Sequence, residues 1–351
     1  SSTSMAVTSS FARTLPKIEL HAHLTGSISP DCLREIWLTS KSTTTLEDPA
    51  IALRPEDGKQ HHDISTFFRI FDSYIYDLVN TPQMVQVATR SVLQAFQEDG
   101  VRYLELRTTP RGHGGTGMGK EEYVEAVIDA IEKFDGREEM PTYLILSVDR
   151  RNTIEEATRV VELAVKLKDR GVVGVDLCGN PSVGPVGHLA PAFEEAKRRG
   201  LKVTLHFAEV PGSSTEDEME MLLSWRPDRI GHVIHTTPSI EEKIQQQGIG
   251  LELCLSCNVL AKMLPDGGGF EDHHFARWKG SNNPIALSTD DVGVFGSSLS
   301  HEYQLAARHF NLNQTEIIEL SRRAVKSIFG GEVERSRLHR LLREVSCSGC
   351  D

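Results

Sequence analysis

Four residues of metal-binding types occur in short strings that read as the ends of strands. His21 and His23 are separated by one residue, so their imidazoles project from the same face of a strand. His206 and Asp290 end two later apolar runs. Three imidazoles and one carboxylate suit Zn²⁺ or a similar divalent ion and leave a coordination position for water. The sequence therefore predicts one Zn²⁺ per chain, held by His21, His23, His206 and Asp290.

Two further residues could move protons beside that metal. Glu209 closely follows His206, and His232 ends another apolar run. A bound Zn²⁺ lowers the pKa of water from ~15.7 to about 7, and a neighbouring acid and base would complete a hydrolytic site. Each residue alone has an ordinary structural explanation, such as a packed histidine or an Asp that caps a helix. Their coincidence at strand ends is what predicts a metal-dependent hydrolase.

The elements that must position these residues alternate between strands and helices. Helices are expected between the strands, as at 153–171, where Thr153 and Glu156 form a capping box. Alternation implies parallel strands with right-handed crossovers, and eight units predict an α/β fold of the (β/α)8 TIM barrel type. The alternative is an open doubly wound sheet, which normally has a glycine-rich turn after its first strand. The eight expected strands are 17–24, 101–110, 141–150, 172–179, 201–209, 229–233, 250–258 and 284–291.

A single barrel over residues 1–351 is the expected domain organisation. Residues 25–100 separate the first two strands and are expected to form a helical insert, in which a helix at 64–79 could cover the barrel mouth as a lid. Further helices are expected from about residue 300 onward. Residues 1–14 are expected to be a disordered tail, with an appended sequence before Met5, and residues 345–351 a C-terminal tail.

The composition excludes several classes of protein. The formal net charge of the 351 residues is −12, which argues against a nucleic acid or an anionic membrane as partner. No run approaches the roughly 18 apolar residues of a membrane-spanning helix. The N-terminal residues lack a signal-peptide pattern, so we expect a cytoplasmic protein. The expected partner is a small molecule, and the expected state is a monomer.

Several strings give the chain a resemblance to a known family. HAHLTGSI, LHFAE, DRIGH and LSTDD occur in the order found in the adenosine/AMP deaminase branch of the amidohydrolase superfamily. YLELRTTPR, VDRR, VDLCGNP, LCLSCN and DDVGVF are most similar to the adenosine deaminase-like proteins that act as N6-methyl-AMP deaminases. These motifs span residues 17 to 291, so the resemblance covers most of the chain.

The resemblance implies a role for each matching residue. Glu209 would donate a proton to purine N1, and His232 would serve as base or electrostatic partner of the attacking water. Asp291 would contact the purine and orient that water, and Gly179 would contact the purine through its backbone. The metal ligands implied are again His21, His23, His206 and Asp290. Further substrate-site residues implied are Thr108, Thr109, Pro110, Arg111 and Asp149, with His23 contributing to both sites.

Thr25 departs from the family pattern. Adenosine deaminases carry Asp at this position and the methyl-AMP branch usually carries Asn, whereas this chain reads His-Leu-Thr-Gly. Thr lacks the negative charge that would repel a 5′-phosphate, and Arg111, Arg150 or Arg151 could bind such a group. The expected reaction is hydrolysis of N6-methyl-AMP to IMP and methylamine, with Arg111 as the favoured phosphate contact.

Three other functions remain as alternatives. The first is deamination of free adenosine, and the second is a dinuclear amidohydrolase. The second lacks the lysine that such sites need after the fourth strand, because no Lys occurs between Lys168 and Lys197. The third is a barrel that only binds ligands, which would not need every catalytic position to be filled.

Six other residues of metal-binding types are not expected to bind a metal. Cys254 and Cys257 are expected to face opposite sides of a strand, so they could not bind the same ion. His61, His62, His273 and His274 are expected in solvated loops.

Overall fold

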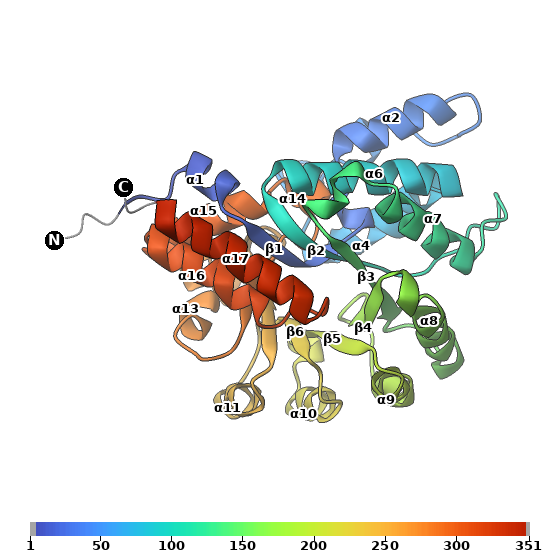
Figure 1. The fold of residues 1–351 in the computed structure, drawn as a ribbon. Helices are drawn as coiled ribbons and strands as arrows, with labels where there is room; N and C mark the ends of the chain where they lie inside the picture. The colour runs from blue at the N-terminus through green and yellow to red at the C-terminus, as the bar shows by residue number, and fades with distance from the viewer. Residues whose placement is uncertain (1–4, 349–351) are drawn as a thin grey trace.

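The computed structural model describes residues 5–348 and contains eight parallel strands that pair in chain order (Figure 1). The strands are β1 (Lys17–His23), β2 (Val101–Thr108), β3 (Thr142–Asp149), β4 (Val172–Cys178), β5 (Lys202–Phe207), β6 (Arg229–His232), β7 (Gly250–Leu253) and β8 (Ile285–Leu287). Beyond β8, a parallel bridge joins Asp290 to Ala22 of β1. The first and last strands therefore meet, which confirms the (β/α)8 barrel and excludes the open sheet.

Amphipathic helices cover the outside of the barrel. Their polar ends are capped as the sequence indicates: the Thr153 hydroxyl accepts from the Glu156 N–H, and the Glu156 carboxylate accepts from the Thr153 N–H. In Figure 1, α9, α10 and α11 lie in a row below the strands. These outer helices are α7 (Lys120–Glu132), α8 (Ile154–Lys166), α9 (Ala190–Arg198), α10 (Glu216–Ser224), α11 (Pro238–Gln247), α15 (Leu299–His309), α16 (Gln314–Val325) and α17 (Glu332–Ser348).

The insert between β1 and β2 is helical, as expected. Its helices are α2 (Pro30–Ser40), α3 (Pro49–Ala52), α4 (Ile64–Ile70), α5 (Tyr76–Leu78) and α6 (Pro82–Glu98). The expected helix at 64–79 is interrupted by a π-helical turn, Phe71–Ile75. Phe67 of α4 stacks on Phe295 of α14 (Val292–Phe295), with ring centroids 5.8 Å apart. The insert therefore packs against the loop that follows β8.

Two segments near the ends of the described residues are more ordered than the sequence indicates. Ser9–Thr14 forms α1, so a disordered tail extending to residue 14 is wrong for this segment. The buried Lys17 ammonium donates to the carbonyls of Ala12, Arg13 and Leu15, which ties α1 to β1. The last helix reaches Ser348, so most of the expected C-terminal tail is helical. Residues 1–4, which the sequence pattern predicts to be appended, and residues 349–351 lie outside the described residues.

One expected strand is half helix. The segment 250–258 is a strand only over Gly250–Leu253, and α12 (Leu255–Leu260) begins directly after Cys254. Its apolar character reflects burial on all sides, and a short buried apolar run does not distinguish a strand from a helix. Cys257 therefore lies in the first turn of α12, and its thiol donates to Asp290 Oδ2 at 2.9 Å. A further short helix, α13 (Phe275–Trp278), precedes β8.

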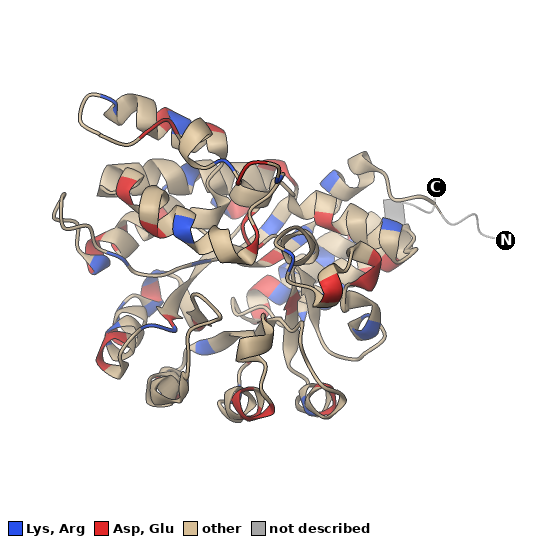
Figure 2. Cartoon of the chain, turned by 180° about the vertical axis from the view of Figure 1, so that it is seen from behind, with Lys and Arg blue, Asp and Glu red and all other residues tan. Residues whose placement is uncertain are grey.

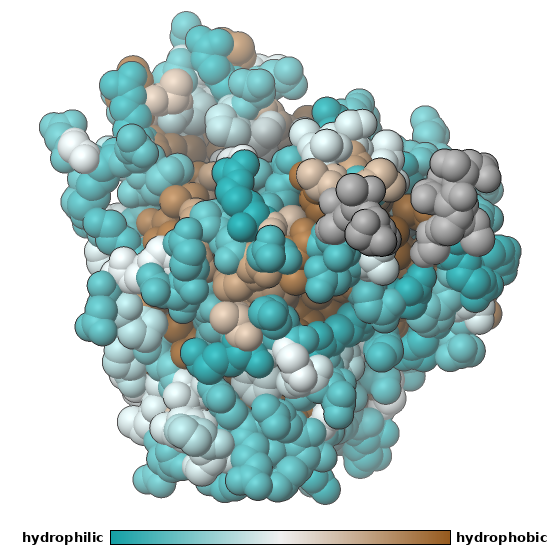
Figure 3. Space-filling model, turned by 90° about the vertical axis from the view of Figure 1, so that its left-hand side faces the viewer, coloured by the Kyte–Doolittle hydropathy of each residue, from teal (hydrophilic) through white to brown (hydrophobic). Residues whose placement is uncertain are grey.

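The surface is largely polar. Basic and acidic residues are interspersed over the helices in Figure 2. Figure 3 shows hydrophilic residues over most of one face, with apolar residues gathered in its recesses. Within residues 5–348, no helix combines the length and apolar character needed to cross a bilayer.

Candidate active site

The strand ends that carry the predicted site residues are locally strained. Ala208, His232, Val233 and Asp290 have φ angles of 53°, 67°, 58° and 62°. This left-handed region costs a non-glycine residue of order 1–3 kcal/mol and is enriched at functional sites. At Asp290, two backbone hydrogen bonds of 2.9 Å hold the strained residue: its N–H donates to the His21 carbonyl, and its carbonyl accepts from the His23 N–H. The contact that closes the barrel thus also positions the site.

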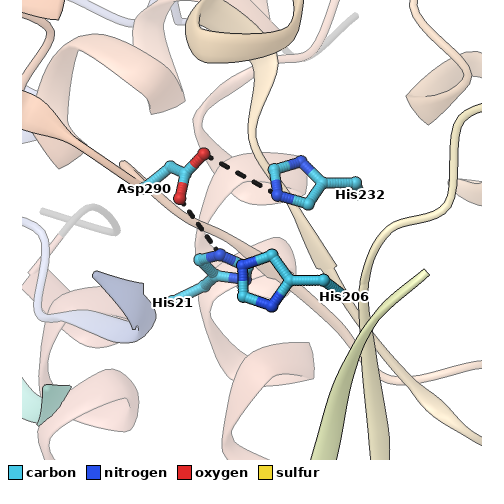
Figure 4. Close-up of side chains that lie close together, drawn as sticks. All are labelled: His21, His206, His232 and Asp290. Carbon is cyan, nitrogen blue, oxygen red and sulfur yellow. Dashed lines mark ion pairs between the residues drawn. The ribbon is translucent and has the colours of Figure 1, made fainter. Parts of the chain in front are cut away.

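The four predicted metal ligands come together at this end of the barrel. His21 Nε2 and His23 Nε2 lie 3.1 and 3.3 Å from the same oxygen, Asp290 Oδ1. His206 Nε2 lies 3.1 Å from His23 Nε2. His232 faces the other oxygen, Asp290 Oδ2, at 3.7 Å. Figure 4 shows Asp290 between His21 and His232, with His206 beside His21. Donor atoms of these four residues, a group that contains His232 in place of His23, lie within 4.8 Å of one another.

The donor set fits a divalent metal. His21 donates from Nδ1 to Glu252 at 2.8 Å, and His206 donates from Nδ1 to Asp176 at 2.9 Å. When these imidazoles are neutral, as metal ligands must be, their Nε2 atoms carry lone pairs directed into the site. His21 Nε2 is buried and lacks a hydrogen-bond partner. Lone pairs and a carboxylate oxygen that face one point repel one another unless a cation lies between them.

The carboxylates behind the histidines belong to an ionic network inside the barrel. Arg107 lies between them, 3.3 Å from Asp176 and 2.9 Å from Glu252, and Arg229 contacts Glu252 at 2.6 Å. All four side chains are fully buried. Although burial opposes it, the Asp176 carboxylate raises the pKa of His206 to about 9, because it stabilises positive charge on the imidazole. This network was not predicted from the sequence, although charged residues inside apolar strands are a detectable signal.

Glu209 and His232 face each other beside the cluster of metal-ligand side chains. Glu209 Oε1 lies 3.3 Å from His232 Nε2, and both side chains are buried. Burial raises the pKa of Glu209 to about 7, since a carboxylate loses hydration there. Glu209 can therefore hold a proton at neutral pH, as a general acid must.

Asp291 is positioned by a close approach to Gly26. A Cβ atom at residue 26 would lie 1.6 Å from Asp291 Oδ1, so only glycine leaves room for this carboxylate. Burial, together with the adjacent Asp290 carboxylate, raises the pKa of Asp291 well above its usual range. Thr25, beside Gly26, lines the same cavity.

The predicted substrate residues share one cavity with few exceptions. Pro110 is buried and is not among the residues that line the cavity, and neither is the candidate metal ligand His21. The lining includes apolar residues of the insert, among them Phe67 and Phe71, so the insert forms one wall. The predicted residues that line it are His23, Thr25, Thr108, Thr109, Arg111, Asp149, Gly179, His206, Glu209, His232, Asp290 and Asp291.

The three candidate phosphate-binding arginines differ in their contacts. Arg111 lines the cavity, but its Nη atoms donate to the carbonyls of Tyr76 and Val79 in the insert. Arg150 is buried and pairs with Glu218 at 2.5 Å, away from the lining. Arg151 lines the cavity with a side chain 55% exposed, although it contacts Asp149 and Asp72.

Three of the four histidines expected in solvated loops are buried. His62 lies inside the insert, where its Nδ1 is hydrogen-bonded to the Thr66 hydroxyl and its Nε2 lies 2.9 Å from the Leu53 carbonyl oxygen. His273 and His274 lie behind the active site with rings stacked 3.9 Å apart. The polar neighbours of these residues in sequence concealed their burial, because contacts between distant segments have no local signal.

Comparison with known proteins agrees with this arrangement. The family model described as "Adenosine deaminase" matches residues 16–345. The chain is 38% identical to the N6-methyl-AMP deaminase of Danio rerio over 95% of this chain and 96% of that protein. It is 35% identical to the N6-mAMP deaminase of Arabidopsis thaliana, covering 93% and 96%.

Solved structures give the same result. The structure of arabidopsis ADAL complexed with IMP superposes with a TM-score of 0.89 and 35% identity, over 96% of this chain and 99% of that one. The apo N6-methyl-AMP deaminase from Arabidopsis thaliana gives a TM-score of 0.88 and 34% identity, over 97% and 100%. Because the family model matches residues 16–345 and relatives 35–38% identical cover more than nine tenths of it, this chain belongs to the adenosine deaminase family.

Proposed function

We propose that this deaminase hydrolyses the C6–N6 bond of a purine ribonucleoside 5′-monophosphate that carries a small N6-alkyl group. The proposed reaction converts N6-methyl-AMP and water into IMP and methylamine. The observation that carries the proposal is the buried Glu209 beside a set of metal-ligand side chains in one cavity. The relatives named N6-methyl-AMP deaminase support the choice of substrate.

The proposed ligands of one Zn²⁺ are His21, His23, His206 and Asp290. His21 and His23 both lie beside Asp290 Oδ1, whereas His232 faces Asp290 Oδ2 and Glu209. We therefore prefer His23 to His232 as the ligand that completes the set with His21, His206 and Asp290 Oδ1. When bound, such a metal supplies Lewis acidity and activates water as a nucleophile. Glu252 and Asp176 hold the Nδ1 atoms of two of these histidines and so orient their Nε2 atoms.

Glu209 would hold the proton that purine N1 needs. Protonation of N1 lets the ring accept the electron pair when C6 becomes tetrahedral, and the amine can then leave as a neutral molecule. Asp291 would contact the purine ring, and the Gly179 backbone would approach it closely. Gly179 has φ 104°, and a Cβ there would lie 2.8 Å from Asp149 Oδ1, so the position requires glycine.

For the 5′-phosphate, the contacts favour Arg151 over Arg111. Each Nη atom of Arg111 donates one hydrogen bond to a carbonyl of the insert, which makes this side chain a tether for one wall of the cavity. Arg151 is half-exposed at the cavity and can exchange its contact with Asp72 for a phosphate. The uncharged Thr25 adds no repulsion toward that group.

A substrate panel tests the proposed function. Steady-state rates are compared for N6-methyl-AMP, AMP, N6-methyladenosine and adenosine with the metal-loaded enzyme and after chelation. The expected result is the highest kcat/KM for N6-methyl-AMP and loss of activity on chelation. Faster turnover of adenosine than of either monophosphate would contradict the proposal and favour a nucleoside deaminase.

Arg151→Ala tests the phosphate contact. The expected result is a KM for N6-methyl-AMP raised about 10–100-fold, the value of a charge-assisted hydrogen bond, with the kinetics on N6-methyladenosine little changed. Arg159→Ala, on the exposed face of α8, is the control and should leave both substrates unaffected. Arg111→Ala should lower kcat/KM for both substrates by the same factor. A loss of kcat/KM confined to the monophosphate in that variant would assign the phosphate contact to Arg111 instead.

A further inference from the structure

Behind His232, three buried side chains form a continuous row of hydrogen bonds. Asn258 of α12 lies 2.9 Å from His232, between the amide Nδ2 and the imidazole Nδ1. Its other amide atom, Oδ1, lies 3.1 Å from His273 Nε2. The row ends at the backbone of α13, where the Phe275 N–H donates to His273 Nδ1 at 3.0 Å. His232, Asn258 and His273 are each 0–1% exposed, so water does not compete for these bonds.

The backbone end of the row fixes the direction of every bond. A peptide N–H can only donate, so His273 Nδ1 must accept and a neutral His273 carries its hydrogen on Nε2. Asn258 Oδ1 then accepts from His273, which leaves Nδ2 to donate to His232 Nδ1. The second Nδ2 hydrogen faces the Met263 sulfur, 3.8 Å away. The opposite amide orientation would place Nδ2 against the N–H of His273, with two donors facing each other.

We propose that Asn258 and His273 are positioning residues that keep the hydrogen of His232 on Nε2, where it points into the active site. His232 Nε2 lies 3.3 Å from Glu209 Oε1 and 3.7 Å from Asp290 Oδ2. The tautomer makes His232 a hydrogen-bond donor to negative charge in the site. It excludes His232 as a base in this state, because its only lone pair accepts from Asn258. The inference deepens the proposed function and depends on it only for the kinetic measurements.

The tautomer of His232 can be measured without activity. The zinc-loaded protein is labelled with ¹⁵N at the histidine imidazoles, and two-bond ¹⁵N–¹H correlation spectra distinguish the Nε2–H, Nδ1–H and metal-bound forms. The His232→Asn variant identifies the His232 signals by their loss. The expected pattern is that of a neutral Nε2–H imidazole. An Nδ1–H pattern, or a metal-bound Nε2, would overturn the proposal even if the enzyme proved active on the proposed substrate.

Asn258→Asp should reverse the tautomer, because a carboxylate can only accept and therefore draws the hydrogen of His232 to Nδ1. The expected result is an Nδ1–H pattern and a kcat for N6-methyl-AMP reduced about 10²–10³-fold, as when one donor to developing charge is removed, with KM nearly unchanged. An unchanged tautomer together with wild-type kcat would contradict the proposal. The metal content and the melting temperature are measured in parallel, to show that the fold and the metal site persist.

His273 offers a matched pair of variants should Asn258→Asp not fold. His273→Leu removes the donor to Asn258 and should lower kcat at least about tenfold. His273→Gln keeps an N–H and a carbonyl on one carbon, in the same relation as the two ring nitrogens, and should recover most of that loss. Equal losses in both variants, at equal thermal stability, would show that His273 only fills space and would overturn its assigned role.

Discussion

The chemistry that each histidine of the site can perform with Nε2 depends on the hydrogen-bond partner of its Nδ1 atom. His21 and His206 donate from Nδ1 to carboxylates, and their Nε2 lone pairs are thereby directed at the proposed metal position. His232 instead accepts at Nδ1 from an amide, so the same side chain presents a hydrogen. Glu209 Oε1 lies 3.3 Å from His232 Nε2, and burial raises the pKa of Glu209 to about 7.

Glu209→Gln should keep the metal and lose the reaction. The amide has nearly the same shape but cannot deliver a proton to N1, so we expect kcat to fall about 10²–10⁴-fold. Metal content by elemental analysis should remain at one per chain, because Glu209 is not among the proposed ligands. A variant that retained near wild-type kcat would remove Glu209 from the mechanism.

Gly26→Ala should displace Asp291 without unfolding the protein. Its Cβ would meet Asp291 Oδ1 at 1.6 Å, so the carboxylate must move away from the substrate. We expect kcat/KM to fall at least about tenfold. Gly114→Ala is the control, because a Cβ there has no heavy atom within 4 Å, and its kinetics should equal those of the wild type. Wild-type kinetics in Gly26→Ala would show that the position of Asp291 is not needed.

The proposed metal ligands could be predicted from the sequence, whereas the roles of Asn258 and His273 could not. His21, His23, His206 and Asp290 stand out because their types and strand-end positions are local features. Asn258 and His273 have roles only through contacts between α12, α13 and β6, which no local pattern encodes. The sequence likewise indicates that Arg111 follows β2, but not that its Nη atoms donate to carbonyls of the insert.

At the scale of elements, the sequence pattern identified the strand and helix order well and its irregular points poorly. The capping box of α8 and the insert helices follow from spacing and polarity. The change from β7 to α12 was missed because a fully buried apolar run suits both structures. The π-helical turn at Phe71–Ile75, which adds Phe71 and Asp72 to the cavity wall, likewise lies within an unbroken helical pattern.

Lys17→Met tests how α1 is attached to the barrel. The Lys17 ammonium is fully buried and is the partner of three carbonyls, so its loss leaves these acceptors without hydrogen bonds. We expect the free energy of unfolding to fall by about 2–4 kcal/mol, measured by denaturant titration. Lys133→Met, at an exposed position after α7, should change it by no more than about 0.5 kcal/mol. Equal effects of the two substitutions would contradict this explanation.

At the scale of the whole molecule, the contact that closes the barrel also positions residues of the site. The β1–β8 contact brings Asp290 to His21 and His23, and the central Arg107 joins carboxylates from β4 and β7. Glu252→Gln alters the hydrogen-bond partner of His21 and should therefore lower the metal affinity about 10–100-fold, measured in competition with a chelator. Glu332→Gln, on the surface, should leave metal affinity unchanged, and equal affinities in both variants would contradict this link.

The central claim is hydrolytic removal of the N6-amine, and isotope labelling tests it most directly. The metal-loaded enzyme is incubated with N6-methyl-AMP in H₂¹⁸O, and both products are measured by mass spectrometry. We predict IMP with one ¹⁸O atom at C6 and methylamine in equal amounts. Formation of AMP with loss of the methyl group alone, or of IMP without ¹⁸O, would contradict hydrolysis at C6 and with it the role assigned to this site.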